Sequence, residues 1–133
     1  MNVRTLVLLS SAIEAATGVA LVAVPDVAGR MLLGVELSAG GTAVARVAGF
    51  ALFALGLACW PASGYATSRA TRALFVYNLP AGVYLGYLRI GGGFTGHLLW
   101  PACALHIVLG GLLVRSAYEG VSVEKADRAS PTS

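Results

Sequence analysis

Four apolar runs, each close to the length that crosses a lipid bilayer, limit what this chain can fold into. They cover about residues 5–24, 41–60, 72–88 and 96–114. A helix needs roughly 20 apolar residues to cross a hydrocarbon core of ~30 Å, whereas barrel strands are shorter and alternate in polarity. The sequence therefore predicts an all-α, polytopic membrane protein whose four transmembrane helices form one antiparallel bundle.

The composition agrees with a membrane protein of one domain. Of the 133 residues, 57% are hydrophobic and only 11% are charged, whereas a soluble domain has about 25% charged residues. We place the transmembrane domain at residues 1–118 and expect the polar residues 119–133 to form a disordered cytoplasmic tail. The first run is longer than the core of a typical signal peptide, so we expect it to remain as a span.

The basic residues are distributed unevenly about the four spans. Six of the nine fall on one side, namely Arg4, Arg69, Arg72, Arg115, Lys125 and Arg128. Arg30 and Arg89 fall on the other side, together with Asp26 and Glu36. Because basic residues favour the cytoplasmic side, we expect both termini in the cytoplasm of a bacterial inner membrane. The basic excess is thereby explained by topology, and it does not indicate nucleic-acid binding.

The segment between the first two spans, Pro25 to Gly41, also shows helical periodicity. Val27, Met31 and Val35 recur every four residues, which places them on one side of a helix. We expect a short helix that lies on the outer membrane surface as a spacer.

Each predicted span contains one strongly polar residue, and these residues lie at similar depths. At 1.5 Å per residue, Glu14 lies about 15 Å and His106 about 14 Å from the inner surface. Asn78 falls in the inner half of its span or near the midplane, and Arg46 lies about 8 Å below the outer surface. Ionisable groups in membranes usually face the bundle interior and pair. We therefore predict that Glu14 and Arg46 form an ion pair with hydrogen-bonding neighbours.

Two interpretations of this polar set stay open. It could bind a small ligand, proton or ion, or it could only fix how the helices pack. For the first case, we take as candidate ligand-binding residues Glu14, Arg46, Asn78, His106 and Tyr77.

The layout resembles the DoxX-like group of small bacterial membrane proteins with four helices. The resemblance covers most of the chain up to about Arg115 and rests on "SAIEAATG", "AVARVAG", the "YN" at 77–78 and "LLWPACALH". Members of that group are associated with quinol oxidation or with thiol and redox homeostasis. The resemblance implies a membrane redox subunit or a protein that binds a lipophilic ligand, and it supplies no catalytic residues.

The chain is also similar to the small multidrug exporters. These have four helices, a similar size and a glutamate in the first helix, as in "AIEAATG", and they couple drug movement to protons through that acid. The chain departs from them because Arg46 is expected to neutralise Glu14 and because its charge bias is clear.

We therefore expect a small membrane subunit that binds a lipophilic or small-molecule ligand at an intramembrane polar site, redox-linked through a quinone. It would act as a homo-oligomer or in a larger membrane complex. The alternatives are a proton-coupled transporter and a purely structural subunit. The sequence contains no hydrolase triad, phosphate loop or zinc motif, which disfavours an enzyme and predicts neither catalytic nor metal-binding residues. Haem is disfavoured because His97 and His106 share one helix, so that two axial histidines would need two chains.

Overall fold

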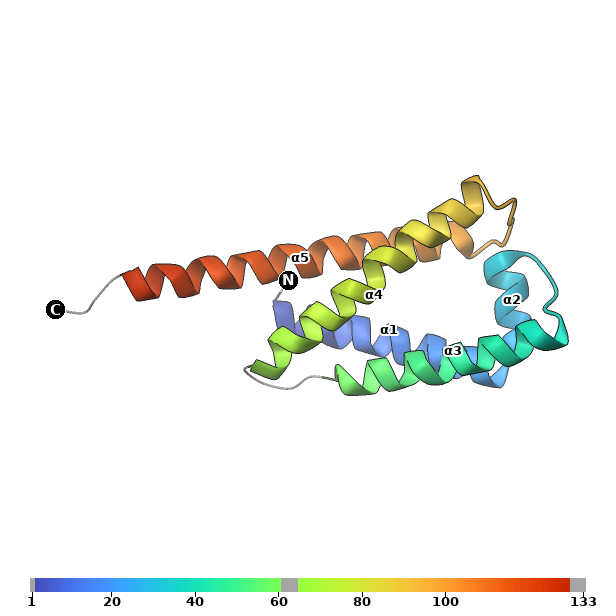
Figure 1. Ribbon diagram of the computed structural model, residues 1–133, viewed down its shortest axis with the longest axis horizontal. Helices are drawn as coiled ribbons and strands as arrows, with labels where there is room; N and C mark the ends of the chain where they lie inside the picture. The colour runs from blue at the N-terminus through green and yellow to red at the C-terminus, as the bar shows by residue number, and fades with distance from the viewer. Residues whose placement is uncertain (1, 61–64, 130–133) are drawn as a thin grey trace.

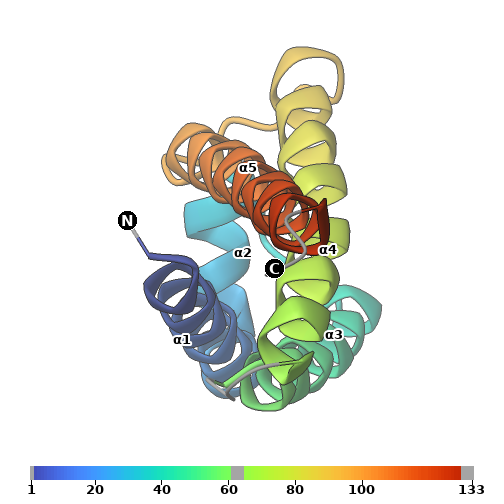
Figure 2. The same ribbon diagram turned by 90° about the vertical axis from the view of Figure 1, so that its left-hand side faces the viewer.

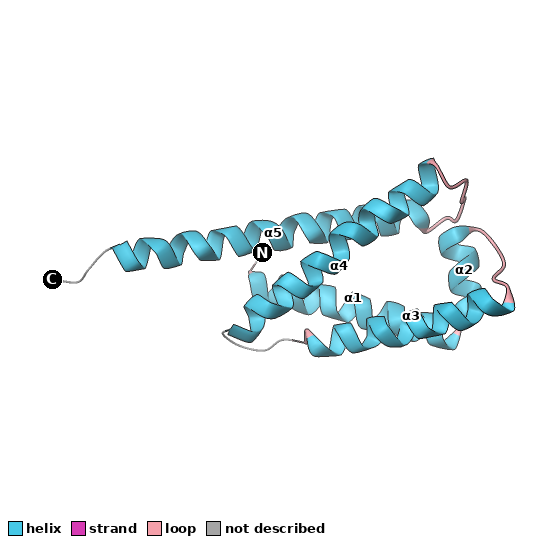
Figure 3. Ribbon diagram, viewed as in Figure 1, coloured by secondary structure: helices cyan, strands magenta, loops and turns pink. Residues whose placement is uncertain are grey.

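The computed structural model describes residues 2–60 and 65–129. These residues form five α-helices and no strand, which confirms the all-α prediction for this part of the chain (Figure 3). The helices are α1 (Val3–Ala23), α2 (Pro25–Leu33), α3 (Ala39–Ala58), α4 (Tyr65–Ile90) and α5 (Leu99–Ala129).

Three of the helices are long and apolar enough to cross a membrane. They are α1, α3 and the Leu99–Ser116 part of α5. α4 is long enough, with 26 residues, but its composition does not place it among these three. It carries Arg69, Arg72 and Arg89 in addition to Asn78. These three helices are compatible with a membrane protein, while a fourth span over residues 72–88 stays a prediction.

Local capping interactions explain where the first three helices begin and end. The Asn2 side chain accepts a hydrogen bond from the backbone N–H of Arg4, and Ser38 accepts one from Gly41, so both act as N-caps. α2 follows α1 almost directly, with Pro25 at its start. It ends at Gly34, whose φ of 76° lies in the left-handed region. The predicted short helix between the first two spans is therefore confirmed, although it stops before Val35.

The helices pack as two hairpins. α1 lies along α3, and α4 lies along α5 (Figures 1 and 2). Within the first hairpin the backbones approach closely at glycines. A Cβ atom on Gly18 would lie 2.5 Å from the backbone nitrogen of Phe53, and one on Gly56 would lie 2.6 Å from the carbonyl oxygen of Ser11. Small residues permit this contact between helices in a membrane.

The two hairpins meet at both ends of the molecule. At the end where α1 begins, apolar side chains from α1, α4, α5 and the residue that caps α3 form a buried core, namely Leu6, Val7, Cys59, Ala70, Leu74 and Leu113. At the other end α2 lies across the bundle and contacts α1, α3 and α5 (Figure 1). The loop between α4 and α5 is joined to α2, because the backbone N–H of Leu98 donates to the carbonyl of Met31 over 2.9 Å.

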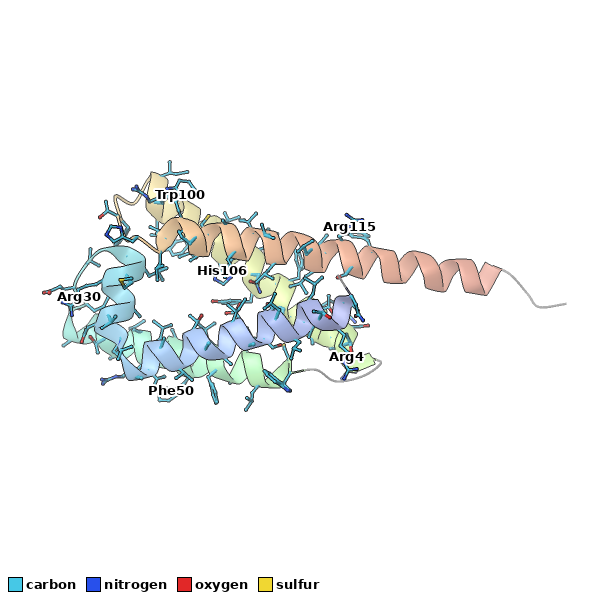
Figure 4. The ribbon with its side chains drawn as sticks, turned by 180° about the vertical axis from the view of Figure 1, so that it is seen from behind. Arg4, Arg30, Phe50, Trp100, His106 and Arg115 are labelled. Atoms are coloured by element: carbon cyan, nitrogen blue, oxygen red, sulfur yellow. The ribbon has the colours of Figure 1, made fainter. Side chains whose placement is uncertain are left out.

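Charged side chains lie at both ends of the bundle. Figure 4 shows Arg4 and Arg115 near the end of the bundle from which α5 projects, and Arg30 at the opposite end. Arg30 pairs with Glu36 at 3.3 Å, and both side chains are exposed. Asp26 accepts a hydrogen bond from the Thr42 hydroxyl over 3.2 Å, which joins α2 to the start of α3.

The C-terminal region differs from the prediction. α5 continues to Ala129 and projects beyond the rest of the bundle (Figure 1), whereas we expected a disordered tail from residue 119. The polar composition suggested disorder, but the stretch contains no proline before Pro131, and glutamate, lysine and alanine there have good helix propensity. The predicted tail residues 130–133 lie outside the described part of the chain.

The close packing of α1 and α3 predicts a large effect of a side chain at Gly49. A Cβ atom there would lie 2.7 Å from the carbonyl oxygen of Gly18. We expect Gly49→Leu to destabilise the protein by about 1–3 kcal/mol, because the two backbones must separate. Gly40→Leu is the matched control, since the nearest atom to its Cβ lies 3.9 Å away. Thermal unfolding in detergent measures both variants, and equal melting temperatures would contradict the packing.

Candidate functional site

A network of buried polar side chains lies where the two hairpins meet. Ser10 and Glu14 come from α1, Asn78 from α4 and His106 from α5. The first three are fully buried, and His106 is 9% exposed. Figure 4 shows His106 on the side of α5 that faces α1. The network therefore joins three helices of both hairpins, as was predicted for Glu14, Asn78 and His106.

Asn78 is the centre of this network. Its amide nitrogen donates to the Ser10 hydroxyl over 3.2 Å and to the backbone carbonyl of Leu74 over 2.9 Å. Its amide oxygen lies 2.8 Å from Nδ1 of His106. The Leu74 carbonyl can only accept a hydrogen bond, so the amide nitrogen must face it and the oxygen must face the histidine. It follows that Nδ1 of His106 carries a proton and donates a hydrogen bond to the amide oxygen of Asn78.

This hydrogen bond determines what the other ring nitrogen can do. In a neutral imidazole with a proton on Nδ1, Nε2 is a hydrogen-bond acceptor. Among the described residues, no side chain or backbone group hydrogen-bonds to Nε2. The ring of Tyr77 packs edge-on against His106, with centroids 5.7 Å apart and planes at 82°. Nε2 is therefore the nitrogen that remains available to a ligand.

Glu14 lies beside Asn78 and His106 but makes no hydrogen bond in the described part of the chain. Its Oε1 is 3.9 Å from Nδ1 of His106, which is beyond hydrogen-bonding distance. Both carboxyl oxygens and the hydroxyl of Ser11 are buried, and none of them has a hydrogen-bond partner among the described residues. Leaving such groups unsatisfied costs about 1–3 kcal/mol each. Helix packing alone does not explain this carboxyl group, because an apolar side chain at position 14 would avoid that cost.

The predicted ion pair between Glu14 and Arg46 is wrong. Arg46 is exposed on α3, and no described residue pairs with it. Gly56 of α3 lies against Ser11 and Ala15, which stand before and after Glu14 in α1, so the level of Glu14 corresponds to Gly56. Arg46 is ten residues away from Gly56, or about 15 Å along the helix. The depth estimate was reasonable, but the glycine side of α3 faces α1 and the arginine does not.

A cavity of about 700 Å³ lies between the two hairpins and under α2. All five helices contribute to its wall, which is mainly aliphatic. Ile13, Leu52, Leu85 and Leu105 line its length, and Met31 of α2 lines it at one end. Its polar lining residues are Thr17, Tyr77, Tyr84 and His106. Since His106 also belongs to the buried network, the network adjoins the cavity.

The structure thus brings together Glu14, Asn78, His106 and Tyr77 and leaves Arg46 outside. Among the predicted residues, Tyr77 and His106 contact the cavity directly, while Glu14 and Asn78 lie behind them. Sequence reasoning did not identify Ser10 as the partner of Asn78, although its place one turn before Glu14 was a signal. It also did not predict that α2 contributes to the cavity. Comparison with protein-family models, with curated proteins and with solved structures gives no match.

Two double-mutant cycles test which residues contact each other. We expect Asn78→Ala and His106→Ala to be coupled by about 0.5–2 kcal/mol, because each removes a hydrogen-bond partner of the other. Arg46→Ala and Glu14→Gln should be additive within about 0.5 kcal/mol, because the two side chains do not meet. The free energy of unfolding in detergent measures both cycles. A coupling energy between Arg46 and Glu14 would indicate that the two side chains form an ion pair, and it would contradict the described arrangement.

Proposed function

We propose that this chain is a membrane protein that binds a lipophilic ligand with a polar head. The apolar part of the ligand occupies the cavity between the hairpins, and its head lies at His106 and Tyr77. We also propose that α4 is a fourth span, that both termini are cytoplasmic and that the membrane is a bacterial inner membrane. The ends of the molecule support this orientation, because Arg4 and Arg115 share one end while Arg30, Asp26 and Glu36 lie at the other.

The observation that carries the proposal is the cavity itself. Its volume of about 700 Å³ is within the usual range for small-molecule sites, which are mostly apolar with a few well-placed polar groups. Here the polar groups are an imidazole, two phenol hydroxyls and the Thr17 hydroxyl. The imidazole is held in one orientation by Asn78. Such a site suits a molecule that is apolar along most of its length.

The hydrogen bonds of His106 indicate the chemistry of the head. Nε2 accepts hydrogen bonds, so it favours a ligand hydroxyl over a ligand carbonyl. The Tyr77 hydroxyl can donate to a second ligand oxygen. A quinol offers two hydroxyl groups and an apolar substituent, and it therefore fits better than the corresponding quinone. This chemistry agrees with the redox association that the DoxX-like resemblance implies, and a homo-oligomer or a larger complex would supply any electron-transfer partner.

A second candidate function, proton-coupled transport, is favoured by the carboxyl group of Glu14. It is fully buried, has no hydrogen-bond partner among the described residues and lies 3.9 Å from His106. The expected neutralisation by Arg46, which argued against this function, is removed with the ion pair. A transporter would move a bound cation when a pH gradient is imposed, and Glu14→Gln would stop that movement. A binding subunit would show no uptake in the same vesicles.

Filling the cavity tests the binding proposal. Ala102 lines the cavity from α5, whereas Ala104 is exposed on the same helix and lines neither it nor the groove described below. We expect Ala102→Phe to abolish binding of a short-chain benzoquinol and Ala104→Phe to leave it unchanged. Binding is measured by fluorescence quenching or calorimetry with purified protein in detergent. Equal binding by the two variants would contradict the proposed location.

The head group is tested by single hydroxyl deletions. Tyr77→Phe keeps the ring contact with His106 but removes a hydrogen bond, and we expect binding to weaken up to about tenfold. Tyr84→Phe is the matched control, because this tyrosine also lines the cavity but stacks on Tyr87. Wild-type protein should bind the quinol more tightly than the quinone. A preference for the quinone would contradict the assignment of Nε2 as the acceptor.

Cysteine labelling tests the orientation. Glu36, whose side chain is 85% exposed, should react after substitution with cysteine when a membrane-impermeant maleimide is added outside intact cells. Ser68, exposed on the first turns of α4, should react only after the membrane is opened. The native cysteines, Cys59 and Cys103, are buried and should give little background. The reverse pattern would place both termini outside.

A further inference from the structure

A second apolar groove lies on the outside of the α4–α5 hairpin, away from the proposed ligand cavity. It has a volume of about 520 Å³. Its lining residues from α4 are Thr71, Arg72, Phe75 and Leu79, and those from α5 are Gly110, Gly111, Leu113, Val114 and Tyr118. It shares no lining residue with the cavity between the hairpins. Its occupant must therefore be argued separately.

Two adjacent glycines explain why the groove is open. Gly110 contacts Leu79, since a Cβ atom there would lie 3.3 Å from the Leu79 backbone nitrogen. Gly111 has no atom within 4 Å of the place where a Cβ would be. The first glycine thus lets the helices approach, and the second leaves space beside them. Phe75 and Val114 form apolar walls of that space.

The groove ends in positive charge. Arg72 lines it and is exposed, and Arg69 lies one turn earlier on α4. The acidic side chains that the structure describes lie elsewhere: Glu14 in the buried network, Asp26 beside Thr42 and Glu36 beside Arg30. An apolar groove with a basic end is complementary to a molecule with an acyl chain and an anionic head.

We propose that this groove holds one acyl chain of an anionic phospholipid, whose phosphate pairs with Arg72. Basic pockets between membrane helices on the cytoplasmic side are suited to anionic lipid head groups. A phosphate also accepts several hydrogen bonds from one guanidinium, which makes arginine a strong partner for it. The lipid would be retained by the shape of the groove as well as by charge. The proposal does not depend on the function of the other cavity.

Native mass spectrometry of the purified full chain tests the proposal. The probes are phosphatidylglycerol and phosphatidylcholine with identical acyl chains. We expect wild-type protein to retain one phosphatidylglycerol in preference to phosphatidylcholine. Gly111→Leu should abolish this retention by filling the groove. Gly40→Leu, the same change at an open helix position, should leave retention unchanged.

A second variant tests the charge without changing the packing. Arg72→Gln should weaken phosphatidylglycerol binding about fivefold, which corresponds to roughly 1 kcal/mol for one arginine near a lipid surface. Arg89→Gln, at the opposite end of α4, should not. Three results would each overturn the proposal. They are retention of phosphatidylglycerol by Gly111→Leu, equal binding of the two lipids by wild-type protein, and unchanged phosphatidylglycerol binding by Arg72→Gln. A wild-type dimer that Gly111→Leu dissociates would also overturn it, because a second chain would then occupy the groove.

Discussion

The two hairpins are joined by hydrogen bonds of the Asn78 side-chain amide, and the rest of the arrangement depends on them. Apolar contacts between α1 and the α4–α5 hairpin surround this amide, but in a bilayer such contacts gain little over contacts with lipid. A hydrogen-bonded group is different, because separating it from its partners leaves polar atoms unsatisfied in hydrocarbon. Asn78 bonds to Ser10 of α1 and to His106 of α5. It thereby sets the depth at which the hairpins meet.

The same bonds orient the site. The Leu74 carbonyl determines which end of the amide faces His106, and the amide oxygen in turn determines which ring nitrogen carries the proton. A backbone acceptor on α4 therefore decides the chemistry of an imidazole on α5. Glu14 lies beside this pair, with its Oε1 3.9 Å from Nδ1 of His106. The structural and ligand-binding interpretations of the polar residues thus use the same contacts, and only measurements of binding distinguish them.

The sequence predicted some levels of this structure much better than others. Helix positions followed from apolar runs, and the convergence of Glu14, Asn78 and His106 followed from depth alone, since the rise per residue is constant. The rotation of each helix did not follow. The glycines Gly18, Gly49 and Gly56 determine which side of α3 meets α1, and depth counting carries no information on this side. Arg46 was therefore assigned to the right helix and a plausible depth, but to the wrong side.

The use of the glycines also explains why a cavity remains. Within the first hairpin they allow backbone contact, so α1 and α3 behave as one thick element, and Gly82 and Gly110 bring α4 and α5 together in the same way. Between the hairpins, the buried apolar cluster of the described residues lies at the end that contains Leu74 and Leu113. At the other end α2 keeps the hairpins joined without filling the space between them. In a bilayer this shape is tolerable, because an apolar molecule in the cavity can replace the contacts that a tighter bundle would make.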